Sequence, residues 1–173
     1  EGPSTELVEY DGSSIQQIEV AGNHSRQAAP SFLPGAGAVY QNELFFTTYT
    51  LPENEREGTP AVKGIYATDG SGVRTVDSDI VTAGEFIPTF TTYDGTLYFA
   101  GDDGSDGLEL WSYDGSTVDQ VEDINTGVGG SAPQNLTVYD GTLYFSADDG
   151  SSGRELWSYD GSNVTLAEDL YSG

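Results

Sequence analysis

The chain has 173 residues, of which 29 are aspartate or glutamate and only 5 are lysine or arginine, so its formal net charge is −24. Such an acidic surface repels nucleic acid and anionic membranes, which argues against both as partners. Cysteine is absent, which excludes disulfide, zinc–thiolate and thiol chemistry. The charge balance suits a saline or cation-rich exterior, as in halophilic proteins; solubility alone is the simpler explanation.

No apolar run approaches the ~18 residues of a membrane-spanning helix, and no signal peptide remains, so no membrane insertion is expected. Methionine is absent even from position 1. We therefore expect the chain to be processed or to be part of a longer protein. Three Asn-x-Ser/Thr sequences would accept glycans if the protein is exported, at Asn23, Asn135 and Asn163.

Residues 1–27 form half of a repeat unit and predict two strands. Within them, the apolar pair Leu7-Val8 precedes a Tyr-Asp-Gly-Ser turn. Leu110-Trp111 precedes the same turn further along the chain, at Tyr113–Ser116. The N-terminal segment therefore corresponds to the second half of a complete unit.

Residues 28–80 form a full unit that carries an inserted loop. Leu44 lies 53 residues before the matching leucine of the next unit, whereas Ile65 lies 45 residues before its match. Eight residues are therefore inserted between these two positions. The insertion falls in Tyr49–Lys63, where prolines and charged residues predict a loop.

The units 81–128 and 129–173 are near-copies of each other. Their segments Tyr93–Ser116 and Tyr139–Ser162 are identical at 20 of 24 positions, at a period of 46 residues. A period of this length with several short strands per unit is typical of repeat architectures. A glycine-rich linker, Asn125–Pro133, joins the two units.

Within a unit the apolar residues alternate with a period of two, which predicts strands rather than helices. Leu97 and Phe99 share one face of their strand, and Tyr98 takes the other. Asp-Gly pairs between such runs predict tight hairpins, since glycine supplies the positive φ that these turns need. The last unit gives four strands, at Gln134–Tyr139, Thr142–Ala147, Glu155–Tyr159 and Asn163–Leu170.

Four antiparallel strands in each unit of ~40–50 residues describe a blade of a β-propeller. The predicted fold is therefore all-β, with about 3.5 four-stranded blades and no helix. A β-solenoid and a string of β-sandwich modules are the alternatives, and both fit less well, since solenoid coils are shorter and sandwiches need ~7 strands. A closed ring usually needs at least ~4 blades. We therefore expect this chain to be a fragment, or other chains to complete the array by pairing with exposed strand edges.

The octapeptide ELWSYDGS occurs at Glu109–Ser116 and at Glu155–Ser162, the second time after the run Thr142–Arg154. In these motifs the chain resembles the ELWxxDGT-repeat proteins that bacteria and archaea secrete or display. The match covers residues 84–173 well and residues 38–76 loosely. The resemblance implies a propeller-like, extracellular protein of adhesion or surface structures. The chain departs from the family pattern by lacking a second Gly-Thr pair and by replacing the final threonine, at Ser116 and Ser162.

Two glycine-rich loops, Asp102–Glu109 and Asp148–Glu155, carry clustered carboxylates, which are the ligands that calcium prefers. The spacing does not fit an EF-hand. A solvated hairpin loop, in which each aspartate makes a local turn, is the alternative interpretation. No other cofactor is predicted, and the candidate calcium ligands are Asp102, Asp103, Asp106, Asp148 and Asp149.

In an up-and-down blade, the turns between strands 1–2 and 3–4 lie at one end, and the 2–3 loops and inter-blade linkers lie at the other. The Tyr-Asp-Gly turns are therefore expected on one face and the Asp-Asp-Gly loops on the opposite face. Exposed tyrosines beside aspartates would suit contact with sugars, whereas tyrosines that pack over neighbouring turns are the structural alternative. Trp111 and Trp157, at equivalent positions, are predicted to lie between blades.

No catalytic site is predicted. His24, the only histidine, lies in a polar linker, and the carboxylates lie in turns, where burial that raises a pKa is not expected. We expect a non-enzymatic protein of the cell exterior that acts as a structural, assembly or adhesion module. Its chains would join one another or other surface proteins through blade faces and strand edges, forming a filament if the contact does not close. The alternatives are a carbohydrate- or calcium-dependent binding module that uses the loop faces and, less favoured, a fragment of a propeller hydrolase.

Overall fold

The computed structural model describes residues 8–10, 15–17, 37–50, 61–82, 90–151 and 153–170. All regular structure in these ranges is β-strand, and none of it is a helix with the length and apolarity that a membrane crossing needs. The strands are β1 (Val8–Tyr10), β2 (Ile15–Gln17), β3 (Ala38–Tyr40), β4 (Glu43–Thr50), β5 (Ala61–Thr68), β6 (Val73–Thr82), β7 (Thr91–Tyr93), β8 (Thr96–Gly101), β9 (Glu109–Tyr113), β10 (Val118–Glu122), β11 (Gln134–Tyr139), β12 (Thr142–Asp148), β13 (Arg154–Tyr159) and β14 (Val164–Glu168).

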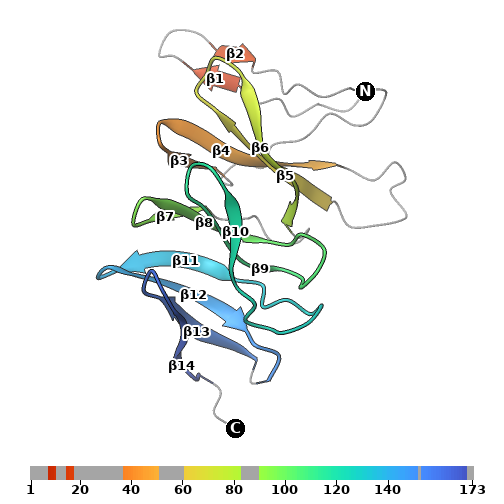
Figure 1. The fold of residues 1–173 in the computed structure, drawn as a ribbon. Helices are drawn as coiled ribbons and strands as arrows, with labels where there is room; N and C mark the ends of the chain where they lie inside the picture. Colours follow the sequence, from red (N-terminus) through yellow and green to blue (C-terminus); the bar gives the residue numbers. More distant parts are fainter. Residues whose placement is uncertain are drawn as a thin grey trace.

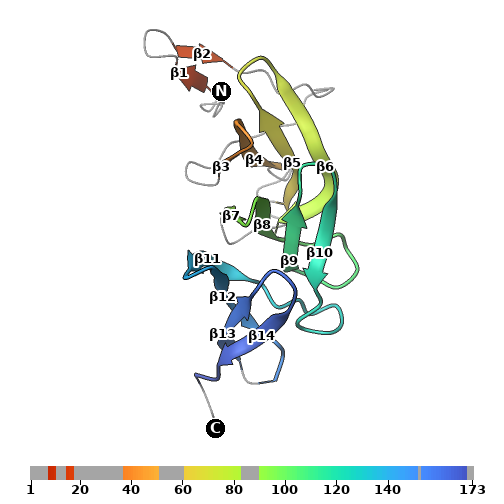
Figure 2. The ribbon, with the colours of Figure 1, turned by 60° about the vertical axis from the view of Figure 1, so that its left-hand side comes forward.

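The strands form a two-stranded hairpin, β1–β2, and three antiparallel sheets of four strands each, β3–β6, β7–β10 and β11–β14. Within each sheet the strands lie side by side in chain order. Figures 1 and 2 show the three sheets following one another in a row, each face to face with the next. The all-β, four-stranded repeat that the sequence predicts is confirmed.

Two-residue turns close the first hairpin of each sheet. Both turn residues have positive φ: 45° and 75° at Asp94-Gly95, and 47° and 76° at Asp140-Gly141. This is the type I′ geometry, whose twist matches that of the flanking strands. In the β3–β4 hairpin, Gln41-Asn42 adopts the same conformation with φ values of 48° and 66°. The Asp-Gly pairs therefore act as the sequence predicts.

The first sheet corrects the predicted loop. Part of the predicted loop Tyr49–Lys63 is strand, since Tyr49 pairs with Val62, and residues 51–60 lie outside the described part of the chain. One irregularity in the β4–β5 ladder, with the extra residue on β5, absorbs the register change, and the inserted residues lengthen both strands. β6 also continues to Thr82, two residues past the predicted end of this unit at 80. Long strands satisfy the backbone polar groups that a loop of equal length would leave to water.

Alternate residues of the middle sheet pack in opposite directions. Leu97 and Phe99 belong to the core formed with the β3–β6 sheet, which includes Phe45 and Ile65. Tyr98 and its neighbours on that face belong to a second core formed with the β11–β14 sheet. Each fully buried side chain of this size stabilises the fold by about 1.5–3 kcal/mol.

The two tryptophans also lie between sheets, as predicted. Trp111 is part of the first core, and Trp157 packs at the edge of the second. Both indoles occupy the same position in their strands, 46 residues apart. Their role is therefore to fill the space between successive sheets.

Candidate functional site

The Tyr-Asp-Gly turns gather along one edge of the row of sheets, as predicted. The hydroxyl of Tyr40 donates to the carbonyl of Gly95 at 2.7 Å, and that of Tyr93 donates to the carbonyl of Gly141 at 2.9 Å. Each tyrosine thus connects its own turn to the corresponding turn of the next sheet. Tyr93 also contacts Tyr159 edge-on, with ring centroids 6.2 Å apart. These tyrosines serve packing, which is the structural alternative that the sequence left open.

The aspartates of the second hairpin in each sheet are occupied by their own turns. Asp114 accepts hydrogen bonds from the backbone N–H groups of Thr117 at 2.9 Å and Ser116 at 2.7 Å. These bonds hold the pKa of Asp114 below its ordinary value. Asp160 makes the same pattern with Asn163 and Ser162, and its pKa is lowered for the same reason.

The opposite edge contains a buried carboxylate. Glu109, at the start of β9, is 0% exposed. Its Oε1 accepts from the N–H of Ser131 at 2.7 Å and of Asn125 at 3.3 Å, and its Oε2 accepts from the Ser131 hydroxyl and from the N–H of Ile124 at 3.2 Å. Burial raises the pKa of Glu109, and the four hydrogen bonds oppose that shift. The carboxylate thereby fixes the linker that leads from β10 to β11.

The glycines of this linker let it approach the end of β9 closely. A Cβ on Gly130 would lie 3.0 Å from the carbonyl oxygen of Leu108 and closer still to its backbone nitrogen. The N–H of Ala132 donates to that same carbonyl at 2.8 Å, and the N–H of Asp148 donates to the carbonyl of Ser131 at 3.0 Å. The linker is therefore an ordered part of the contact between two sheets.

Gly130→Ala is expected to destabilise the protein by about 3 kcal/mol, because the methyl group meets backbone atoms that cannot move aside. Gly127→Ala is the matched control, since Gly127 also has positive φ but nothing within 4 Å of an added Cβ. The control should cost about 1–2 kcal/mol, from backbone strain alone. Equilibrium urea denaturation measures both. Equal losses in the two variants would show that the approach of the linker to β9 is not tight.

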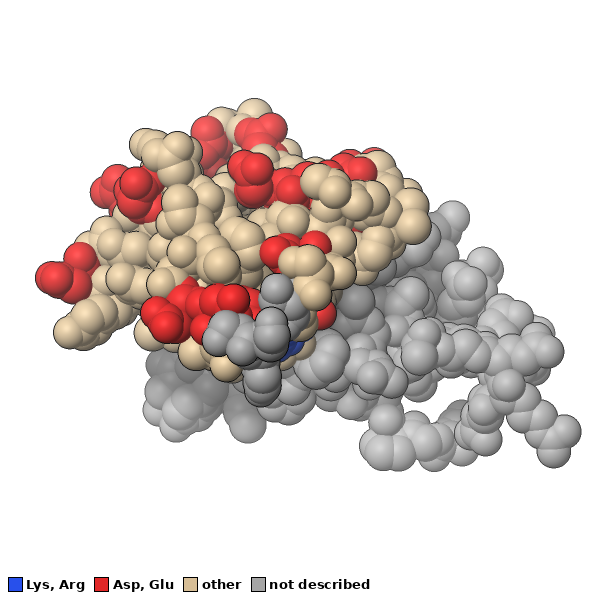
Figure 3. Space-filling view, turned by 90° about the horizontal axis from the view of Figure 1, so that it is seen from below, with Lys and Arg blue, Asp and Glu red and all other residues tan. Residues whose placement is uncertain are grey.

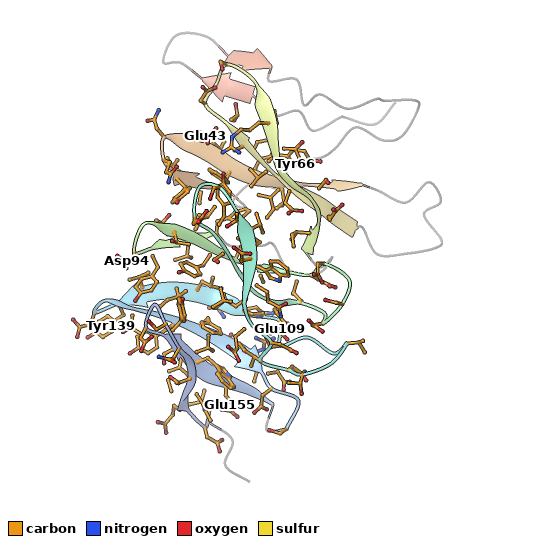
Figure 4. The ribbon with its side chains drawn as sticks, in the orientation of Figure 1. Glu43, Tyr66, Asp94, Glu109, Tyr139 and Glu155 are labelled. Carbon is orange, nitrogen blue, oxygen red and sulfur yellow. The ribbon has the colours of Figure 1, made fainter. Side chains whose placement is uncertain are left out.

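Glu155 is the counterpart of Glu109 in the last unit, and it has fewer hydrogen-bond donors around it. Its side chain is 2% exposed. One carboxylate oxygen, Oε2, accepts from the N–H of Leu170, as Glu109 accepts from Ile124. The other, Oε1, is buried and has no hydrogen-bond partner among the residues that the structure describes, which end at Leu170. Figure 4 shows Glu109 and Glu155 along the edge opposite to Asp94 and Tyr139.

The outer face of the β11–β14 sheet, on the side away from the β7–β10 sheet, exposes apolar side chains. We call it the outer face and define it by Tyr139, Tyr144, Leu156 and Leu170, with Glu155 at its edge. Tyr139 is 72% and Leu170 61% exposed, and Tyr144 and Leu156 are half-buried. Figure 3 looks onto the row from this end and shows uncharged surface with Asp and Glu side chains between and around it.

The predicted calcium loops make local turns instead of a shared site. Asp102 accepts from the N–H of Gly104 at 2.6 Å, and Asp148 accepts from Gly150 at 2.8 Å. Side-chain and backbone hydrogen bonds from Ser105 lower the pKa of Asp103, and Asp149 makes the same bonds with Ser151. Asp106 lies 3.3 Å from the hydroxyl of Ser105. Among the described residues no three His, Cys, Asp or Glu side chains form a group that could hold a metal ion, so calcium binding stays a prediction.

The remaining predicted residues lie apart from these features. Asn135, on β11, and Asn163, in the turn before β14, have exposed side chains. Glycosylation at both positions stays a prediction. His24 and Asn23 lie outside the described residues.

Sequence reasoning missed the buried pair Glu109 and Glu155. A signal was present, since a glutamate opens both copies of ELWSYDGS, where the alternating pattern assigns it the same face as the buried tryptophan. A charged residue repeated at such a position indicates a buried acceptor. The donors that satisfy Glu109 lie 15 to 22 residues away in the linker, and no local pattern identifies them.

Comparison with protein-family models and with curated proteins finds no match for this chain. One solved structure to which the chain is similar is Zg3597, a family 117 glycoside hydrolase of the marine bacterium Zobellia galactanivorans. The TM-score is 0.43 at 15% sequence identity, over 97% of this chain. The chain spans 56% of the length of that structure. No family is assigned by these comparisons.

Proposed function

We propose that the protein is a non-enzymatic repeat module of the cell exterior, which acts by assembly through the outer face of its β11–β14 sheet. The observation that carries this proposal is a difference between equivalent residues. Tyr93 is 8% exposed and Leu110 is 0% exposed, because the β11–β14 sheet covers them. Their counterparts Tyr139, 72% exposed, and Leu156, half-buried, carry the same side chains, and no other sheet of the described residues covers them.

Charge supports the same proposal. Figure 3 shows Asp and Glu side chains over much of this end of the row, and the chain carries a net charge of −24. Two such surfaces repel each other in dilute buffer, and salt reduces the repulsion. Apolar contact also strengthens in salts that are excluded from protein surfaces. Association through this face should therefore increase with ionic strength, which fits a saline exterior.

Analytical ultracentrifugation of the full chain over a concentration series, at low and high salt, tests the proposal. We expect larger species that grow with concentration and salt. Tyr139→Ser should weaken this association by at least about tenfold, because large aromatic residues dominate contact energies. Its stability should change by less than about 0.5 kcal/mol, since the ring is exposed.

Val128→Ser is the matched control, because Val128 is 88% exposed and lies on the linker, outside the outer face. This variant should associate like the original chain. A protein that stays monomeric under all conditions would contradict the proposal. So would equal association of the Tyr139 and Val128 variants.

A further inference from the structure

We infer that the outer face is a docking site for one further four-stranded sheet of this same repeat, which enters with a Gly-Ser segment ahead of its first strand. This inference rests on the proposed function and names the partner. Two recognition points at opposite edges of the face carry it, Glu155 and Tyr139. Each has a counterpart in the middle sheet, and the hydrogen-bond partner of that counterpart is known: Ser131 for Glu109 and Gly141 for Tyr93.

The outer face repeats the side of the middle sheet that another sheet already covers. At a spacing of 46 residues, its members correspond one to one and preserve the kind of side chain. The pairs are Tyr93 with Tyr139, Tyr98 with Tyr144, Glu109 with Glu155, Leu110 with Leu156, and Ile124 with Leu170. In the middle sheet this surface packs against the backbone and side chains of β11–β14. The surface that fits the outer face is therefore that of another such sheet.

The buried oxygen of Glu155 specifies how the partner enters. On Glu109, the equivalent oxygen accepts from the N–H of Ser131 at 2.7 Å, and the other accepts from the hydroxyl of the same serine. A buried carboxylate oxygen without a donor costs free energy, so it favours a partner that brings one. The Gly130-Ser131 segment brings two donors, and glycine at this place allows the close approach.

Tyr139 specifies the opposite edge. At both contacts between sheets, a tyrosine from the first hairpin turn donates to a glycine carbonyl in the corresponding turn of the next sheet, from Tyr40 to Gly95 and from Tyr93 to Gly141. Tyr139 holds the same position with its ring 72% exposed. The partner must therefore present an Asp-Gly turn at one edge and a Gly-Ser segment at the other, as the β11–β14 sheet does with Asp140-Gly141 and Gly130-Ser131.

Lengthening the full chain by one unit tests the inference. A copy of residues 128–173 added directly after Gly173 places its serine 22 residues after Glu155, the separation of Ser131 from Glu109. The measurements are chemical nitration of tyrosines, read by mass spectrometry, and hydrogen exchange at the Leu170 amide. We expect both Tyr139 nitration and Leu170 exchange to slow by at least about tenfold, the factor that ~1.4 kcal/mol of added protection gives.

Glu155→Gln, made in the original and in the lengthened chain, separates recognition from general packing. A carboxamide presents N–H groups where the serine needs an acceptor. The substitution should therefore reverse the protection of Leu170 in the lengthened chain and change little in the original chain. Glu122→Gln, at an exposed glutamate of β10, is the control in both.

Four results would overturn the inference. In the first, the nitration rate of Tyr139 stays unchanged although the added unit folds. In the second, Glu155→Gln changes the exchange of the Leu170 amide equally in both chains. The third is protection of Tyr139 in the original chain by added polysaccharide, with no effect of the added unit, which indicates a carbohydrate occupant. An added unit that stays unfolded would also count against it, because the same sequence folds against the β7–β10 sheet. The added unit could pack on the outer face although the original chain stays monomeric. That result would reject the proposed function but support this inference.

Discussion

Replacing Glu109 with alanine is expected to lower the free energy of unfolding by about 3–5 kcal/mol. The carboxylate accepts four hydrogen bonds from Ile124, Asn125 and Ser131, and three of the donors are backbone N–H groups. Alanine leaves these donors in an interior site without an acceptor, and each buried donor left so costs about 1–3 kcal/mol. Water entering the vacated space recovers part of this loss.

Urea denaturation followed by tryptophan fluorescence gives the stability difference. Glu122→Ala is the control, because Glu122 is an exposed glutamate of β10, the strand that leads into the same linker. It should change stability by less than about 0.5 kcal/mol. Hydrogen exchange should also show the Ser131 amide opening in the Glu109 variant. An equal, small effect of both substitutions would mean that the linker is held by its other contacts alone.

Phe99→Ala should cost a similar amount, about 3–5 kcal/mol, for a different reason. The ring is fully buried between the β3–β6 and β7–β10 sheets, 5.5 Å from the ring of Phe90. Its removal leaves a cavity that rigid sheets on both sides cannot close, and the lost transfer and dispersion energies add. Thermal and urea unfolding should both register the loss.

Val128→Ala is the control for Phe99→Ala, since the valine side chain is 88% exposed, and its effect should stay within about 0.5 kcal/mol. The Phe99 variant should also expose apolar surface between the first two sheets. A loss of under about 1 kcal/mol for Phe99→Ala would show that the sheets do not pack face to face as described.

The strands of the last unit could be predicted closely from the sequence. The run Gln134–Tyr139 matches β11 at both ends, and the Asp140-Gly141 turn has the conformation that its residues predict. These features depend on neighbours a few residues apart, so a local pattern contains the information. The first unit is less predictable, because an insertion between Leu44 and Ile65 can become a loop or longer strands. Pairing between β4 and β5 decides which.

The candidate site could be predicted only in part. Sequence alone indicated that the tyrosine turns lie on one edge and the linkers on the other, since strand direction determines this. It did not decide whether Tyr93 contacts a sugar or packs inside the protein. The packing role follows from its hydrogen bond to the carbonyl of Gly141, which lies in another sheet. Sequence alone also gave no role to Glu155, whose importance appears only when its one hydrogen bond among the described residues is compared with the four of Glu109.

By itself, the sequence determined the β-strand period, the hairpin turns, the repeat length of 46 and the acidic surface, because each is set by residue type or by spacing along the chain. Only the tertiary structure decided which glutamate is buried, how the insertion is absorbed and which face stays uncovered. Those outcomes depend on contacts between residues that are far apart in the sequence and belong to different sheets or to the linker between them. The burial of Glu109 requires a linker that returns to β9, and the exposure of Tyr139 depends on what lies beyond its sheet.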